Sequence, residues 1–333
     1  MLVPACTQQV GKMNTLLRGQ IFLFVVLSFV GGGNAAYASI GKWLYESNHS
    51  IEVFVAGLDE NTATVDGEGW LYYVKNDAKK GAKHKSCTVL IHGFAAEASH
   101  WLRFVSKLKH DQCVIVPDLP GFGRSSFVAA GKYSIVEQVK RLQRFLTQLQ
   151  LASTYHFVGS SMGGQIAGMY AVKFPEDVAS LVLINAGGVL SPAKSDMDLQ
   201  LEKTGKSIFD VESTDEYRAM FNMTMSDPPW MPDVVMEHLS KSAIERNKRN
   251  RAIFQQVYQQ DLLDDHLNKI VTPTLILWGA EDRLLHSSMA NVFHKGIVGS
   301  TLIVIPDLGH LPFLEQPGDT AQLFDRFIAD LLK

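Results

Sequence analysis

The chain has 333 residues, of which 46% are apolar and 20% are charged, and its formal net charge at pH 7 is −3. That length is enough for one large domain with insertions or for two small domains. The charge balance argues against a nucleic-acid-binding protein, because such proteins usually carry a basic stripe. The three cysteines include no Cys-x-x-Cys pair and the chain has no His-Glu-x-x-His sequence, so we expect no metal site.

The first 38 residues have the layout of a secretory signal and contain no acidic residue. Lys12 and Arg18 precede an apolar run over 21–30, and an Ala-x-Ala sequence ends at Ala38. We therefore predict a signal peptide, cleaved after Ala38, that exports the protein to the periplasm or the medium. Counted from Leu16, the same stretch is long enough to cross a bilayer if it stays uncleaved. An N-terminal membrane anchor is therefore the alternative.

Residues 39–65 are predicted to form an amphipathic approach segment, and short strands then alternate with helices over 66–333. Most of the predicted strands are continuous apolar runs, as expected for strands that are covered on both faces. Such alternation is typical of a parallel sheet wrapped by helices. The predicted strands cover 69–74, 87–91, 113–117, 155–158, 180–184, 273–279 and 301–305, and the predicted helices cover 99–108, 135–149, 165–172 and 319–332.

Residues 189–268 interrupt this alternation with a mostly helical, polar stretch that is rich in methionine. We expect this stretch to form a helical cap above the C-terminal edge of the sheet, where ligands bind in open α/β folds. The Met, Phe and Trp side chains of 220–231 suit an acyl-chain pocket or a lid, and they suit an ordinary cap core equally well.

The sequence Gly159-Ser160-Ser161-Met162-Gly163 lies between a predicted buried strand and a predicted helix. Gly-x-Ser-x-Gly in this setting is a nucleophile elbow, a tight turn that holds the serine in a strained backbone conformation at the sheet edge. The start of the following helix favours the negative charge that develops there. The bare motif is a weak signal, so its strand–helix context supports Ser161 as the nucleophile.

A serine hydroxyl needs a base within hydrogen-bond reach, and the base needs a third group to hold it. His310 follows the last predicted strand and is our candidate base, because the ends of parallel strands share one edge with Ser161. Asp282 follows the strand at 273–279 and is our candidate acid, with Glu281 as the alternative. The order Ser161, Asp282, His310 matches the order known for α/β hydrolases.

The tetrahedral intermediate of acyl transfer needs two preorganised N–H donors. Met162, directly after the nucleophile, is one candidate for an oxyanion-hole donor. Phe94, in the turn after the strand at 87–91, is the other, and Gly93 lets that backbone turn inward. His92 also ends this strand, and we expect it to shape the loop rather than to act as a base.

The chain resembles the α/β-hydrolase-fold serine hydrolases over about residues 66–333. Five motifs that occur in order carry this resemblance: His92-Gly93-Phe94, Asp118-Leu119-Pro120-Gly121-Phe122-Gly123-Arg124-Ser125, Gly159-Ser160-Ser161-Met162-Gly163-Gly164, Trp278-Gly279-Ala280-Glu281-Asp282 and Gly309-His310. The resemblance implies a mostly parallel sheet with a helical cap inserted after the sixth strand.

Within this superfamily the chain is most similar to bacterial lipases of the Psychrobacter/Moraxella type and to membrane-anchored monoacylglycerol lipases. The similarity lies in Gly159–Ala171 and in the following Phe174-Pro175-Glu176-Asp177-Val178. It implies hydrolysis of fatty-acid esters of glycerol through a Ser-His-Asp triad and an acyl-enzyme, with no cofactor. The implied partner is a lipid or ester substrate, and the N-terminus and the cap are candidate contacts with a membrane surface.

Two other kinds of protein stay open on the same frame. C–C bond hydrolases and haloperoxidase-like enzymes keep the serine, but they are typically cytosolic, and the leader argues against them. A non-catalytic binding protein is a minor alternative, because every triad position is filled.

Cys87 and Cys113 each lie five residues before the motif that ends their strand, and the two strands are neighbours in this fold. A disulfide is an option in an exported protein, but we expect two buried free thiols. Cα atoms more than about 7 Å apart would exclude the bridge.

Overall fold

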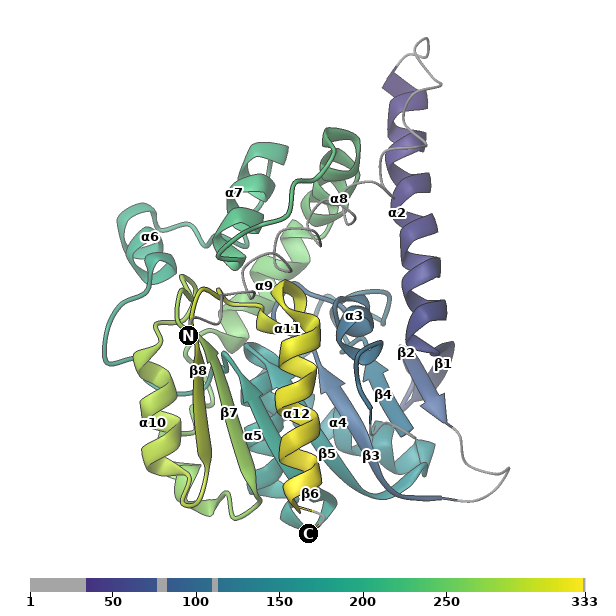
Figure 1. Cartoon of the computed structure of the whole chain (residues 1–333). Helices are drawn as coiled ribbons and strands as arrows, with labels where there is room; N and C mark the ends of the chain where they lie inside the picture. Colours follow the sequence, from purple (N-terminus) through teal and green to yellow (C-terminus); the bar gives the residue numbers. More distant parts are fainter. Residues whose placement is uncertain (1–33, 77–82, 110–112, 332) are drawn as a thin grey trace, which may run out of the picture.

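The computed structural model describes residues 34–76, 83–109, 113–331 and 333, and an eight-stranded sheet runs through its centre (Figure 1). The strand order is β1-β2-β4-β3-β5-β6-β7-β8. β1 and β2 pair antiparallel, β2 pairs antiparallel with β4, and all later neighbours are parallel. The strands are β1 Asp59–Val65, β2 Glu68–Asn76, β3 His84–Ile91, β4 Cys113–Pro117, β5 Ala152–Ser160, β6 Val178–Ile184, β7 Thr274–Gly279 and β8 Thr301–Ile305.

Helices cover both faces of this sheet, as the continuous apolar strands require. Side chains of α4, α5 and α10 join one face in a large buried cluster. Side chains of η2, α3, α11 and α12 join the opposite face in a second cluster. The helices are η2 Ala98–Trp101, α3 Leu102–Val105, α4 Ile135–Leu149, α5 Met162–Lys173, η3 Pro175–Asp177, α10 Ser288–Gly296, α11 Pro312–Glu315 and α12 Pro317–Leu331.

The helix α4 shows why these segments become helices. The hydroxyl of Ser134 accepts a hydrogen bond from the Glu137 N–H and caps the N-terminus. Gln150, in the left-handed conformation, ends the helix. Between them, buried apolar side chains recur every three or four residues and face the sheet. The observed bounds are those predicted from the sequence.

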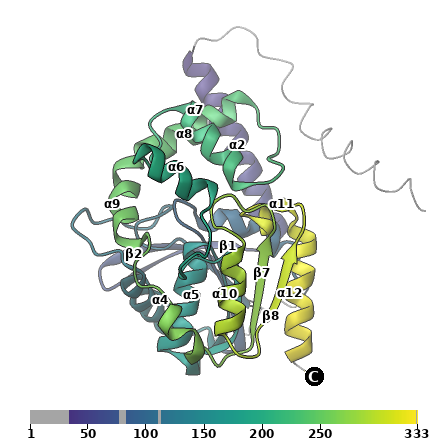
Figure 2. The ribbon, with the colours of Figure 1, turned by 90° about the vertical axis from the view of Figure 1, so that its left-hand side faces the viewer.

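The cap follows β6, the sixth strand, and lies above the C-terminal edge of the sheet (Figure 2). Its helices are α6 Asp196–Thr204, α7 Thr214–Thr224, α8 Asp233–Glu245 and α9 Asn247–Val257, and η4 Asp264–Lys269 leads back to β7. The predicted position of the cap is therefore confirmed, and the cap places a helical roof over the strand ends that carry the motifs.

The segment 39–65, predicted as an approach to the domain, contains the edge strand β1 and most of the helix α2, Asn34–Ala56, which begins within the predicted leader. α2 packs against α8 and α3 and extends beyond the body of the molecule (Figure 1). Among the residues described, no helix combines the length and apolar character needed to cross a membrane. Most of the predicted leader lies outside the described residues, and cleavage after Ala38 stays a prediction.

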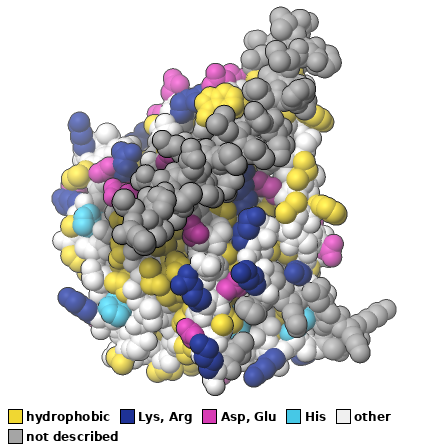
Figure 3. All heavy atoms as spheres, in the orientation of Figure 1, with side chains coloured by type: hydrophobic (Ala, Val, Ile, Leu, Met, Phe, Trp, Pro, Cys, Tyr) yellow, Lys and Arg dark blue, Asp and Glu magenta, His cyan; other side chains and the backbone are white. Residues whose placement is uncertain are grey.

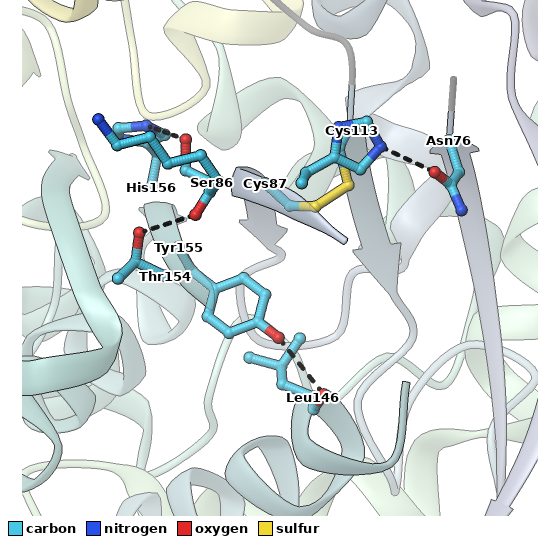
Figure 4. Close-up of a disulfide and its surroundings, with 10 residues drawn as sticks. Asn76, Ser86, Cys87, Cys113, Leu146, Thr154, Tyr155 and His156 are labelled. Atoms are coloured by element: carbon cyan, nitrogen blue, oxygen red, sulfur yellow. Dashed lines mark hydrogen bonds between the residues drawn. A yellow bond between two sulfur atoms is a disulfide. The ribbon is translucent and has the colours of Figure 1, made fainter. Parts of the chain in front are cut away.

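The expectation of free thiols at Cys87 and Cys113 is wrong, because the structure joins them in a disulfide (Figure 4). The parallel register pairs Thr88 with Val114, which sets the two cysteines opposite each other with their Cα atoms 4.7 Å apart. That spacing falls within the range of disulfides. The bridge links β3 and β4, the strands whose ends carry the His92 and Asp118 loops.

Candidate active site

Ser161 occupies a strained turn between β5 and α5. Its φ of 56° and ψ of −122° put a non-glycine residue in a backbone region that costs energy. The turn is held by the surrounding structure, since the Ser161 N–H donates to Ile184 O and Gly187 N–H donates to Ser161 O. The side chain therefore stands at the N-terminus of α5, as the elbow motif predicts.

The turn His92-Gly93-Phe94 after β3 carries one of the two predicted oxyanion donors and is named the oxyanion loop. It lies directly against Ser161. A Cβ atom on Gly93 would come within 3.0 Å of Ser161 Cβ and 3.6 Å of Ser161 Oγ, so only glycine lets the backbone approach this closely. In the described part of the chain, neither the Phe94 nor the Met162 N–H donates a hydrogen bond. Both predicted donors therefore remain available beside the nucleophile, which is the requirement for an oxyanion hole.

His92 and Asp118 fix the shape of this loop. The Leu119 N–H donates to His92 Nε2 at 3.0 Å, so the ring carries its proton on Nδ1, which donates to Gly93 O at 2.8 Å. Full burial lowers the pKa of His92 to about 4 and keeps the ring neutral. The Asp118 carboxylate accepts from Ala98 N–H at 2.7 Å and ties the two loops together.

Burial, and then the nearby charge of Glu97, raise the pKa of Asp118 to about 6. The carboxylate accepts a second backbone N–H, from Arg124, at 2.8 Å. The Asp118 carboxylate thus accepts the N–H groups of Ala98, at the start of η2, and of Arg124, in its own loop. These contacts indicate a structural function rather than proton transfer.

His310 and Asp282 meet at the ends of β8 and β7. His310 Nδ1 lies 2.8 Å from Asp282 Oδ2, and the two side chains are 4% and 0% exposed. Asp282 Oδ1 accepts the N–H groups of Leu284 and Leu285, so the carboxylate is fixed from both sides. Glu281, the alternative acid, is exposed. This contact fits the predicted function of Asp282 as the acid that orients a histidine base.

Ser161, after β5, and His310, after β8, lie at the same C-terminal edge of the parallel part of the sheet, with β6 and β7 between their strands. Among the described residues, no hydrogen bond joins Ser161 Oγ to the imidazole. Such hydrogen bonds are often long without substrate and tighten in the reacting complex. The pairing of nucleophile and base therefore stays a prediction, which the labelling experiment below tests.

Asn185 is a further residue beside the predicted acid, Asp282. It directly follows β6 and has a φ of 44°, and its Nδ2 donates to Asp282 Oδ2 at 2.7 Å, the oxygen that faces His310. Its Oδ1 accepts the Gly279 N–H at 3.1 Å. The sequence signal was the position of Asn185 at a strand end between the serine and aspartate strands.

The cap closes over the oxyanion loop with aromatic side chains. The Phe94 ring packs edge-on against Phe122, and against Phe209 and Phe254 of the cap at centroid distances of 5.1 and 5.4 Å. Met220 and Met223 pack into a small cap core, whereas Trp230 is 82% exposed. The apolar side chains of 220–231 therefore divide between a cap core and a solvent-facing loop.

Among the described residues, no group of three or more His, Cys, Asp or Glu side chains could hold a metal ion. The carboxylates near the end of the cap accept hydrogen bonds from the backbone instead. Asp264 accepts the Leu190 N–H and Asp261 accepts the Val136 N–H.

Comparison with known proteins assigns the family. A family model described as the α/β hydrolase fold matches residues 89–317, most of the chain. The chain belongs to the α/β-hydrolase fold family. The fold class predicted from the sequence is thereby confirmed, and the sheet order and the strained serine turn agree with it.

Relatives of this α/β hydrolase include several lipases. The chain is 33% identical over 258 residues to monoacylglycerol lipase abhd6-A of Xenopus laevis, covering 74% of this chain and 77% of the relative. It is 30% identical over 289 residues to Lipase 1 of Psychrobacter immobilis, covering 85% and 86%. These relatives and the fold make it a lipase-like carboxylester hydrolase.

One solved structure matches almost the whole α/β hydrolase. It is described as a membrane phospholipase A and a bacterial virulence factor. The TM-score is 0.83 at 31% identity, and the match covers 96% of this chain and 100% of that chain. The cap and α2 therefore belong to the shared architecture.

Proposed function

We propose that this hydrolase cleaves fatty-acid esters of the acylglycerol type with a triad of Ser161, His310 and Asp282. The observation that supports this most directly is the strained Ser161 beside two undonated N–H groups, those of Phe94 and Met162. A nucleophile that meets two such donors is suited to acyl transfer. No cofactor is needed for this chemistry.

In the proposed cycle His310 removes the proton of Ser161, whose oxygen attacks the ester carbonyl. The N–H groups of Phe94 and Met162 stabilise the oxyanion, and the alcohol leaves with the proton from His310. Water, activated by the same imidazole, then releases the fatty acid. Asp282 holds the imidazole tautomer and stabilises its charged form through the 2.8 Å contact.

A fluorophosphonate probe tests the nucleophile. We expect one covalent adduct on Ser161, no adduct in Ser161→Ala, and labelling slowed by about 10³–10⁴ in Asp282→Asn, because the amide stabilises the wrong histidine tautomer. A folded wild-type protein that forms no adduct would support the binding-protein alternative and end the triad proposal.

The acylglycerol class is supported by the names of the relatives, which are monoacylglycerol and other lipases. The aromatic side chains of Phe94, Phe209 and Phe254 between the oxyanion loop and the cap suit an acyl chain. We expect p-nitrophenyl esters of medium or long acyl chains to give a higher kcat/KM than the acetate. Activity confined to the acetate would indicate a short-chain esterase, and no ester turnover would favour a C–C hydrolase.

We also propose that the protein is exported and works at a membrane surface. The disulfide supports an oxidising compartment. Apolar side chains gather along the exposed side of α2 (Figure 3), where Phe54 is 85% exposed, and Trp230 extends from the cap. The intact mass of the protein from the cell envelope separates cleavage after Ala38 from a retained anchor, and a cytosolic, reduced protein would contradict export.

A further inference from the structure

The backbone around His310 is held by one carboxylate that the triad does not use. Glu315, at the end of α11, accepts the Gly309 N–H at 3.0 and 3.2 Å and the Leu311 N–H at 3.4 Å. These N–H groups belong to the residues on either side of His310. The carboxylate therefore fixes the loop that carries the proposed base.

The same carboxylate also binds the cap. Glu315 Oε2 accepts the N–H of Ser226, just after α7, at 2.8 Å. The His310 N–H donates to the carbonyl oxygen of Thr224, the last residue of α7, at 3.1 Å. All three N–H groups of 309–311 thus end on Glu315 or on the cap.

Gly309 shows how closely the cap lies on this loop. A Cβ atom at this position would come within 2.6 Å of the Ser226 nitrogen and 2.8 Å of the Met225 carbonyl carbon. Backbone atoms cannot move aside as a flexible side chain can. The loop and the cap segment 224–226 are therefore in direct backbone contact, and Glu315 joins them from the side.

We propose that Glu315 is a positioning residue that locks the His310 loop to the cap, so that the base is correctly placed only when the cap is seated. The proposal rests on the proposed function, in which His310 is the base. Asp282 fixes the direction of the ring, and Glu315 fixes the backbone from which the ring extends. A displacement of about 1 Å at a reacting group can cost about 10²-fold in rate.

The first test is Glu315→Gln, which keeps the shape of the side chain but replaces one acceptor oxygen by an NH₂ donor that faces backbone N–H groups. We expect kcat on p-nitrophenyl butyrate to fall by about 10- to 100-fold while KM changes less than about threefold. The kcat of Glu315→Asp should lie between the kcat of the wild type and that of Glu315→Gln. Glu176→Gln, an exposed carboxylate at the opposite edge of the sheet, is the matched control and should leave kcat unchanged.

A purely structural function for Glu315 would give a different result. It would lower the melting temperature while kcat per folded molecule stayed at the wild-type value, and this outcome overturns the proposal. A fall in kcat/KM caused entirely by a higher KM would overturn it as well, because misplacement of the base acts on the chemical step.

The second test removes only the contact with the cap. Met225 is extended, with a φ of −130° and a ψ of 150°, which is compatible with a proline at the next position. Ser226→Pro deletes the N–H that Glu315 accepts and should lower kcat by a smaller factor than Glu315→Gln. The double variant should be no slower than Glu315→Gln alone, whereas factors that multiply would show that cap and carboxylate act independently.

The proposed function and the positioning by Glu315 would be disproved by different results. Wild-type protein that neither hydrolyses esters nor reacts with the fluorophosphonate at Ser161 would disprove the proposed function. Normal wild-type labelling together with wild-type kcat in Glu315→Gln would disprove only the positioning by Glu315.

Discussion

His92 makes two backbone hydrogen bonds and for that reason cannot carry a charge. Its Nε2 accepts from Leu119 and its Nδ1 donates to Gly93, so a second ring proton would face a donor. Burial adds the cost of desolvating an imidazolium and lowers the pKa to about 4. The residue that shapes the oxyanion loop is thus sensitive to pH although it takes no part in proton transfer.

The free energy of unfolding should therefore decrease in acid because of His92. The unfolded chain binds a proton at the ordinary pKa of about 6.5, and the folded chain only near 4, so stability is present above pH 6.5 and is lost as the pH falls through this window. Between pH 7.5 and 4.5 we expect a loss of about 2–3 kcal/mol from this group. Urea unfolding at both pH values measures the loss.

The comparison needs His92→Gln, whose amide oxygen can still accept the Leu119 N–H. This variant should start from a lower free energy of unfolding but lack that part of the pH dependence. His294→Gln, at an exposed position, is the control. An unchanged pH dependence in His92→Gln would show that other groups cause the acid destabilisation.

At the scale of elements, α2 is attached to the body through both polar contacts and close packing. The hydroxyl of Tyr45 donates to Glu97, which also binds Arg246 of the cap, and Arg103 of α3 binds Glu52 of α2. The helix thus touches the cap and the central domain at once. The cap in turn contacts the His310 loop, so a continuous series of contacts runs from α2 through the cap to this loop.

The contact of α2 with α8 requires a glycine at position 41. A Cβ atom there would lie 2.0 Å from the carbonyl oxygen of Val234 and 3.5 Å from His238 Cβ. Alanine would favour the isolated helix by about 1 kcal/mol, but the clash with backbone cannot be relieved by a rotamer and should cost more. We expect Gly41→Ala to separate α2 from α8.

Amide hydrogen exchange along α2 measures this separation. Exchange should become at least tenfold faster in Gly41→Ala, while Ser50→Ala, an exposed position on the same helix, should leave it unchanged. Wild-type protection in Gly41→Ala would show that the two helices can adjust without parting.

At the scale of the whole molecule, the disulfide joins the two strands that hold the oxyanion loop and the Asp118 loop. Cys87 and Cys113 are both buried in the sheet and are 26 residues apart. A cross-link over a loop of this length restricts the unfolded chain and should stabilise the fold by about 3–4 kcal/mol.

The variant Cys87→Ala/Cys113→Val removes the bridge and keeps an apolar filling. It should lose most of that stability and give a melting temperature that no longer responds to reductant. Wild-type protein should lose stability only when reduced. If the oxidised wild type and the double variant unfold at the same denaturant concentration, the bridge contributes nothing.

Much of the architecture follows from local sequence patterns. The bounds of α4 and of the strands β4 and β8 agree with those predicted, because caps and continuous apolar runs act over a few residues. The elbow at Ser161 is equally local, since glycines, strand and helix lie within one stretch. Strand ends at one edge then predict that Asp282 and His310 approach each other, as they do.

Other features depend on contacts between residues far apart in the chain. Asn185 meets Asp282 across 97 positions and Ser226 meets Glu315 across 89, and no local pattern encodes such a pair. The pairing of the two cysteines depends on the register of β3 against β4. The sequence alone therefore determined the sheet apart from its edge strand β1, the cap and the candidate catalytic residues, because these depend on periodicity and strand ends. Only the tertiary structure decided what holds those residues in place, because that depends on which distant side chains packing brings together.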